Sequence, residues 1–562
     1  MTGWNREVNL TTVNEVPVVW AETPGPLRAT LMFRVGRADE HLPWGGITHL
    51  VEHLALFQLG PTQRYEFNGA VTSNRTMFYA TGSTAEIVTF LALVTTALGN
   101  LPLDRVETEK TVLQAEASSR SMSAGDFMFS LRFGTRGNGL HRYREFGLLH
   151  VPPAWITGWA ARYFNRDNAV LWLSGPPPGD LSLMLPAGQR VLESAVQPLA
   201  LSLPAYAQAP VGGAGVSMVA PRSTALAMAT NIAAARLLKR LRFDKGIAYS
   251  VLGGYFPMDR EQAQVSLWTD AQPGQAAAVL NDTVQTMYGI SSAGPTAEEL
   301  ATEVDNIARS FDREDAALAW LDRTAVRILN AEPIQRPADL LADMQTVTPA
   351  AARDAMAPAL KTAIYLGPED VATPPGINTY VPTFALEVQG QGLRHVQGRL
   401  WRHPPTLIVT NEGVTLKINP AESITVRYDS CEAVLRYHDH GICLVGFDGT
   451  SLPVNPREWP QGIVAIQRIM EFLPKDRIVP MPPAESTALA VRVPQDAKGR
   501  SSALRTISLP RVIALVGFVT VAVALVWFAI FGNVSGIGGG PRLLSIALWA
   551  VLGYRLLRRF FR

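Results

Sequence analysis

The stretch Gly45-Gly-Ile-Thr-His-Leu-Val-Glu-His-Leu-Ala-Leu-Phe57 brings two histidines and a glutamate together within five residues: His49, Glu52 and His53. Residues four apart lie on one face of an α-helix, so both imidazoles can reach a single metal ion. Glu52 flanks them and can act on a water molecule held by that metal. The surrounding apolar residues predict that the rest of this helix is buried. The order is the inverse of the common zinc-protease helix; two core histidines capping one another are the alternative.

A carboxylate-rich segment, Asp104 to Ala117, is predicted to be helical and offers a third ligand. Zinc in a catalytic site takes three protein ligands and leaves one position for water. Glu109 and Glu116 are seven residues apart, which is two turns along one helix face, so both can point at the same site. One would bind the metal and the other would orient a ligand. A solvated helix face is the alternative reading, and we expect Glu107 to be solvated.

The segment from Glu7 to Tyr79 resembles the pitrilysin/insulinase (M16) metallopeptidases. The match includes the motif helix, a strand pair before it (Val16 to Trp20 and Ala29 to Gly36) and Phe67-Asn-Gly-Ala-Val-Thr72 after it. The resemblance covers residues 1 to about 375. It implies a Zn²⁺ cofactor and a peptide substrate that adds to the edge of a sheet. The implied roles are zinc binding by His49, His53 and Glu116, general base catalysis by Glu52, support by Glu109, and substrate binding at Asn68, Ala70 and Thr72.

The second half carries Leu241-Arg-Phe-Asp-Lys-Gly-Ile-Ala-Tyr-Ser-Val251, which looks like the Arg-Tyr signature of the same family. A guanidinium and a phenol, here Arg242 and Tyr249, can hold a substrate carbonyl and the oxyanion formed on attack. A helix running into a buried strand is the alternative. This chain has two domains where a full clamshell of the family has four. The resemblance therefore implies a homodimer, in which Arg242 and Tyr249 reach the zinc of the partner. The interval between His53 and Glu116 is shorter than is usual in the family, which implies a trimmed loop.

A faint internal repeat supports two related domains. Val151 to Phe164 reads as a Pro-started helix followed by the strand Ala169 to Gly175, and the same order recurs at Val347 to Met356 and Ala363 to Gly367. The predicted fold class is α+β, with two duplicated M16-type α/β sandwich domains at residues 1–200 and 205–375. Alternating strands closed by one helix predict a small PH-like β-barrel at 385–480, with Cys431 and Cys443 in its core.

The C-terminal part predicts attachment to a membrane. A Pro-, Ala- and Ser-rich linker is expected at 481–510, followed by a transmembrane helical hairpin at 511–558. Val512 to Phe531 is twenty residues without a charge, the length needed to cross a bilayer. Basic residues flank both ends of the hairpin, which favours a cytoplasmic location for both ends. One span followed by a basic interfacial helix is the alternative topology.

Composition narrows the class of protein. The chain has 562 residues, 50 basic against 48 acidic, so it lacks the positive excess of a nucleic-acid-binding protein. Charged residues make up 17%, below the roughly 25% of ordinary soluble domains. Two cysteines cannot form a disulfide framework in a chain this long, which favours a reducing compartment. The N-terminus has no apolar signal core.

These observations favour a membrane-anchored zinc endopeptidase that hydrolyses peptides at the cytoplasmic face of the cell membrane. Two alternatives stay open. One is a catalytically silent scaffold or partner subunit of a membrane-associated protease complex. The other is a protein whose main role is assembly, through the PH-like module and the hairpin, with proteolysis secondary. The presence of all four residues His49, Glu52, His53 and Glu116 favours the enzyme.

Overall fold

The computed structural model describes residues 7–60, 65–119, 123–192, 196–381, 386–397 and 403–482. The hairpin expected at 511–558 and nearly all of the linker expected at 481–510 lie outside these residues. Among the described helices, none is by itself long and apolar enough to cross a membrane. The segments Thr84–Gly99 and Leu103–Ala117 reach that length and composition only as a pair, bent by 81°.

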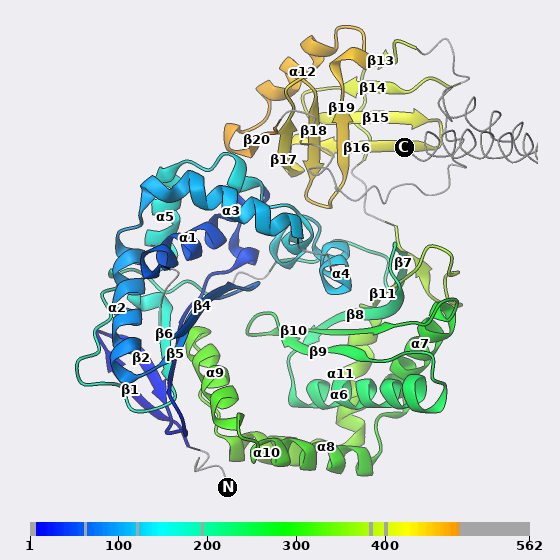
Figure 1. The fold of residues 1–562 in the computed structure, drawn as a ribbon. Coiled ribbons are helices and arrows are strands. Elements are labelled where there is room, and N and C mark those ends of the chain that lie inside the picture. The colour runs from blue at the N-terminus through cyan, green and yellow to red at the C-terminus, as the bar shows by residue number, and fades with distance from the viewer. Residues whose placement is uncertain are drawn as a thin grey trace, which may run out of the picture. The chain divides into compact units, whose positions relative to one another are not determined.

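The first domain is built on a six-stranded sheet with the strand order β1-β2-β6-β3-β5-β4. Strands β2 and β6 pair in parallel and the other neighbours are antiparallel. Helices α1, α2, α3 and α5 pack on one face of the sheet around an apolar core (Figure 1). The strands are β1 (Asn9–Val13), β2 (Val16–Trp20), β3 (Leu27–Phe33), β4 (Glu66–Val71), β5 (Thr76–Gly82) and β6 (Ala169–Leu173). The helices are α1 (Ile47–Leu56), α2 (Thr84–Gly99), α3 (Val106–Ser119) and α5 (Pro153–Tyr163).

The second domain repeats this plan with the strand order β12-β7-β11-β8-β10-β9. Strand β7 pairs in parallel with both β11 and β12, and the β7–β11 pair matches β2 and β6. The predicted repeat corresponds to α5–β6 and α11–β11. The strands are β7 (Ala205–Gln208), β8 (Gly213–Pro221), β9 (Val251–Pro257), β10 (Gln262–Asp270), β11 (Ile364–Gly367) and β12 (Asn378–Thr379). The helices are α6 (Thr224–Leu238), α7 (Ala276–Ala293), α8 (Ala297–Ser310), α10 (Pro337–Gln345) and α11 (Pro349–Lys361).

The two domains each cover the sheet of the other with one helix. Helix α9 (Ala316–Leu329) packs on the first sheet, against residues of β2, β3 and β6 (Figure 1). Helix α4 (Ala124–Phe133) packs on the second sheet, against residues of β11. The buried Arg132 in α4 strengthens this contact, because it donates to the carbonyls of Ser217 and Thr362 at 2.7 and 2.9 Å. Apolar burial on both faces explains why β6 is buried along its whole length.

The module predicted as a β-barrel consists of two separate four-stranded sheets in the described residues, so the expectation of a closed barrel is corrected. Both sheets and helix α12 (Gly462–Glu471) enclose one apolar core. Cys431 and Cys443 are buried and unbridged, as expected. One sheet has β13 (Gly392–Arg394), β14 (Thr406–Val409), β15 (Gly413–Asn419) and β16 (Glu422–Arg427). The other has β17 (Cys431–Arg436), β18 (Ile442–Gly446), β19 (Ser451–Val454) and β20 (Ile478–Pro480). Strand alternation is the same in a barrel and in a sandwich, whereas closure depends on pairing between distant edges.

Candidate metal centre

The buried carboxylate of Glu40 caps the start of helix α1. Gly46 precedes the helix at φ +93°, a conformation that favours glycine, and the Glu40 side chain accepts hydrogen bonds from the amides of Gly46 and Thr48 at 2.8 and 2.9 Å. Glu40 therefore satisfies amides that a helix start leaves without an intrahelical partner. Burial raises the pKa of Glu40 to about 7, against the opposing effect of Arg37 and these hydrogen bonds. Residues such as Leu50 and Leu54 anchor the opposite face of α1 in the core.

Three predicted ligands converge at one point. The Oε2 atom of Glu116 lies 3.8 Å from Nε2 of His49 and 3.7 Å from Nε2 of His53. One ligand atom from each of the three residues lies within 4.8 Å of the other two. Ligands about 2.1 Å from a tetrahedral zinc ion are about 3.4 Å apart, so this cluster is close to the size that zinc requires. The two imidazoles and the carboxylate fit a zinc ion with an open fourth position.

Glu52 lies beside the same cluster. Its Oε2 is 3.7 Å from Nε2 of His49 and 4.0 Å from Nε2 of His53, and the residue is only 4% exposed. Gly69 in β4 packs directly against it, because a Cβ atom at this position would overlap the Glu52 carboxylate. The glycine thus lets the edge strand approach the candidate base, where an extended substrate would also have to lie.

Each histidine has a carboxylate at its other ring nitrogen. Nδ1 of His53 hydrogen-bonds Oε2 of Glu109 at 3.3 Å, as the helical spacing predicted. Nδ1 of His49 lies 3.4 Å from Oε1 of Glu145, a residue that the sequence analysis did not identify. Burial and the neighbouring His49 lower the pKa of His53, although Glu109 opposes the shift. A lowered pKa favours the neutral imidazole, which is the form that binds metal.

The predicted substrate-binding residues are on or next to the edge strand β4. Asn68 is exposed and Ala70 is partly exposed, opposite Tyr79 and Met77 of β5. Thr72 follows the end of the strand, and its backbone groups are engaged in a turn with Arg75 and by the amide of Arg37. Asn68 and Ala70 are therefore better placed than Thr72 to pair with an added strand.

Arg242 and Tyr249 lie together in the second domain. The guanidinium of Arg242 is 4.6 Å from the centre of the Tyr249 ring, and Tyr249 is 71% exposed. Arg242 belongs to a π-helical turn, Lys239–Asp244, at the end of α6. The carboxylate of Asp270 accepts hydrogen bonds from the amides of Tyr249 and Ser250. Burial would raise the pKa of Asp270, but these hydrogen bonds hold it below its usual range.

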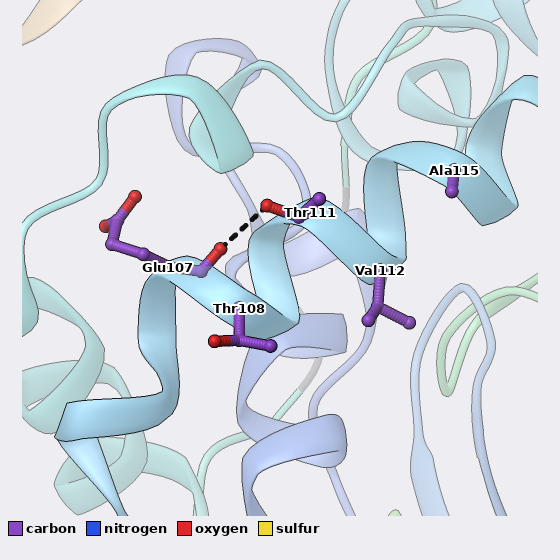
Figure 2. Close-up of a pocket in the computed structure, with 5 residues that line it drawn as sticks. All are labelled: Glu107, Thr108, Thr111, Val112 and Ala115. Atoms are coloured by element: carbon purple, nitrogen blue, oxygen red, sulfur yellow. Dashed lines mark hydrogen bonds between the residues drawn. The ribbon is translucent and has the colours of Figure 1, made fainter.

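An open hollow of about 520 Å³ lies along the outer side of α3 (Figure 2). It is lined by Glu107, Thr108, Thr111, Val112 and Ala115, and contains none of the three candidate metal ligands. The side chain of Glu107 is 84% exposed and pairs with Lys110 at 2.8 Å, so the expectation that it is solvated is confirmed. The carboxylates of α3 thus divide between a solvated side and the metal centre.

Solved structures share this fold. The peptidase M16 inactive domain from Pseudomonas fluorescens is 16% identical, with a TM-score of 0.53 over 66% of this chain and 100% of that one. A protease from Helicobacter pylori is 14% identical, with a TM-score of 0.52 over 64% and 99% of the two chains. The first half of the periplasmic protease PqqL from Escherichia coli is 13% identical, with a TM-score of 0.52 over 65% and 92%.

No protein-family model and no curated protein matches the sequence. At these low identities the structural likeness shows the fold alone. About two thirds of this chain has the fold of M16 peptidase domains, of which some are proteases and one is described as inactive.

Proposed function

We propose that this chain is a zinc-dependent endopeptidase. The observation that carries the proposal is the convergence of His49, His53 and Glu116 on one point, with the buried Glu52 beside it. The fold by itself would not require the carboxylates of Glu116 and Glu52 beside the two histidines. When bound, zinc would polarise the scissile carbonyl and make the attacking water more acidic.

The protein groups would supply the remaining steps. Glu52 would accept a proton from the attacking water and later deliver it to the leaving amine. The substrate would lie extended along β4, where Asn68 and Ala70 belong to the edge strand. Arg242 and Tyr249 would donate hydrogen bonds to the oxyanion.

The proposal includes a homodimer with shared sites, because one chain holds only two domains of the M16 fold. The exposure of Arg242 and Tyr249, both held on the surface of the second domain, supports a role toward a partner copy. Attachment to the cell membrane, with the protease domains in the cytoplasm, rests on the uncharged sequence Val512 to Phe531.

The test uses the full-length protein purified in detergent. We expect about one zinc per chain by elemental analysis and cleavage of quenched fluorescent peptides. A chelator should stop cleavage and added zinc should restore it. Bound zinc without cleavage of any peptide in a diverse set would favour the alternative, a silent scaffold or partner subunit. The domain from Pseudomonas fluorescens, which shares this fold and is described as inactive, is a precedent for this alternative.

A further inference from the structure

Glu145 is a buried carboxylate next to the metal centre but outside the set that the M16 resemblance implies. It is 5% exposed, and its Oε1 lies 3.4 Å from Nδ1 of His49 and 3.5 Å from Nη1 of Arg37. We propose that Glu145 is a positioning residue that orients His49 toward the metal, as Glu109 orients His53. The inference rests on the proposed zinc site and adds a residue to it.

The chemistry of the imidazole gives the reason. A histidine that binds metal through Nε2 carries its proton on Nδ1, and a carboxylate there fixes the tautomer and the orientation of the ring. Both Nε2 atoms face Glu116, and both Nδ1 atoms face a second carboxylate. The two supports come from different parts of the chain: Glu109 from α3, and Glu145 from the segment that follows α4.

The start of α1 is shaped to admit Glu145. A Cβ atom at Gly46 would lie 2.7 Å from Cβ of Glu145, so a larger residue there would displace the carboxylate. The amide of Gly147 donates to the carbonyl of Gly45 at 2.8 Å, which fixes the two segments against each other. Arg37 pairs with Glu145 and also donates to the carbonyl of Tyr143, which holds the local backbone.

The segment that carries Glu145 also packs against the C-terminal module formed by the two four-stranded sheets. Leu140, Tyr143 and Phe146 share an apolar cluster with residues of β17, β18 and β20. The amide of Thr135 donates to the carbonyl of Phe447 at 2.9 Å, and Arg136 pairs with Glu432. Packing on two sides gives Glu145 the rigidity that a positioning residue needs.

The experiment compares the zinc affinity of full-length variants by competition with a chromogenic chelator. Glu145→Gln keeps the size of the side chain and removes its charge, so we expect zinc to bind about 10–100-fold more weakly. The matched control is Glu432→Gln, which removes another buried, arginine-paired carboxylate, one that contacts Arg136 in the segment after α4. The control should bind zinc as the wild type does. Unfolding temperatures in the presence of chelator should be similar for the two variants.

Zinc affinity of Glu145→Gln within twofold of the wild type would overturn the inference and leave the zinc site intact. An equal loss in Glu432→Gln would also overturn it, because general loosening would then explain the effect. Wild-type protein that binds no zinc would overturn the inference and the proposed function together. If Glu145→Gln does not fold, nitrogen NMR of ¹⁵N-histidine-labelled, zinc-bound wild type replaces it. A His49 Nδ1 proton shifted downfield by a hydrogen bond to a carboxylate supports the inference, and an Nδ1 proton at the shift of an imidazole without such a bond contradicts it, because protonation of Nδ1 by itself follows from zinc binding through Nε2.

Discussion

The two domains share one architecture but carry different side chains where two of their helices meet. Helix α1 follows β3 and helix α6 follows β8, the strands that pair with β6 and β11, and each helix packs against a later helix of its domain, α3 or α8. In the first domain this helix pair brings His53 and Glu109 to 3.3 Å beside the candidate metal centre. In the second domain Arg236 of α6 and Glu299 of α8 form an ion pair between the two helices that correspond in chain order, at 2.6 Å.

This difference shows that the fold brings two helices into contact, and that the side chains at the contact determine the chemistry there. Two imidazoles and two carboxylates make a centre that fits a cation. In the second domain the guanidinium of Arg236 and the carboxylate of Glu299 neutralise each other, so this pair does not form a set of metal ligands. The likeness to both proteases and an inactive domain is consistent with this separation of fold from site.

Loss of a ligand should have the largest effect. We expect Glu116→Ala to lose both zinc and peptide cleavage, because only His49 and His53 would remain. Glu299→Ala is the matched control, since α8 corresponds to α3. It should retain one zinc per chain. Elemental analysis after gel filtration measures both variants, and full zinc content in Glu116→Ala would mean that the third ligand lies elsewhere.

Removal of the base should separate binding from catalysis. Glu52→Gln should retain zinc, while kcat falls by about 10²–10⁴-fold because the amide cannot take the proton of the attacking water. Glu303→Gln is a suitable control, because it removes a carboxylate charge in the second domain. Glu303 lies on α8 and accepts a hydrogen bond from Asn231 of α6. Cleavage by Glu52→Gln at the wild-type rate would show that the base has been assigned wrongly.

Mixing of two inactive variants tests whether the domains of two chains share a site. Glu52→Gln and Tyr249→Phe, each inactive alone, should recover about a quarter of the wild-type activity after random pairing. In a mixed dimer, one site would combine Glu52 of one chain with Tyr249 of the other, while the second site carries both defects. A tag pull-down confirms that subunits exchange. Exchange without any recovery would rule out the shared site.

Much of the candidate metal centre could be predicted from the sequence because helical spacing is a local property. His49, Glu52 and His53 share one turn of α1, and Glu116 is two turns from Glu109 in α3. The strand predicted at Val16 to Trp20 is β2. In each of these cases, near neighbours along the chain carry the signal.

Features that depend on tertiary packing could not be predicted in this way. Glu145 is far from His49 in the sequence and sits at the start of a 3₁₀ turn with no helical or strand periodicity. Its contact with His49 exists only because the 143–149 segment packs on the start of α1. Closure of the C-terminal sheets failed as a prediction for the same reason, since the strand pattern carries no information about which edges meet.

The smallest effect concerns the ion pair between α6 and α8 in the second domain. Arg236 donates to both carboxylate oxygens of Glu299, and these contacts, with the amide of Thr296, hold the pKa of Glu299 to about 2. A lowered pKa means that the stabilisation is present above about pH 4.5 and is lost as the pH falls toward 2. Because both side chains are about one third exposed, Glu299→Gln should lower the free energy of unfolding at pH 7 by only about 1 kcal/mol. Urea unfolding between pH 7 and pH 3 measures this difference between the wild type and the variant, which should shrink below pH 4.5. At pH 7 the variant should hold as much zinc as the wild type. A difference that is constant with pH would contradict a charge-based role for the pair.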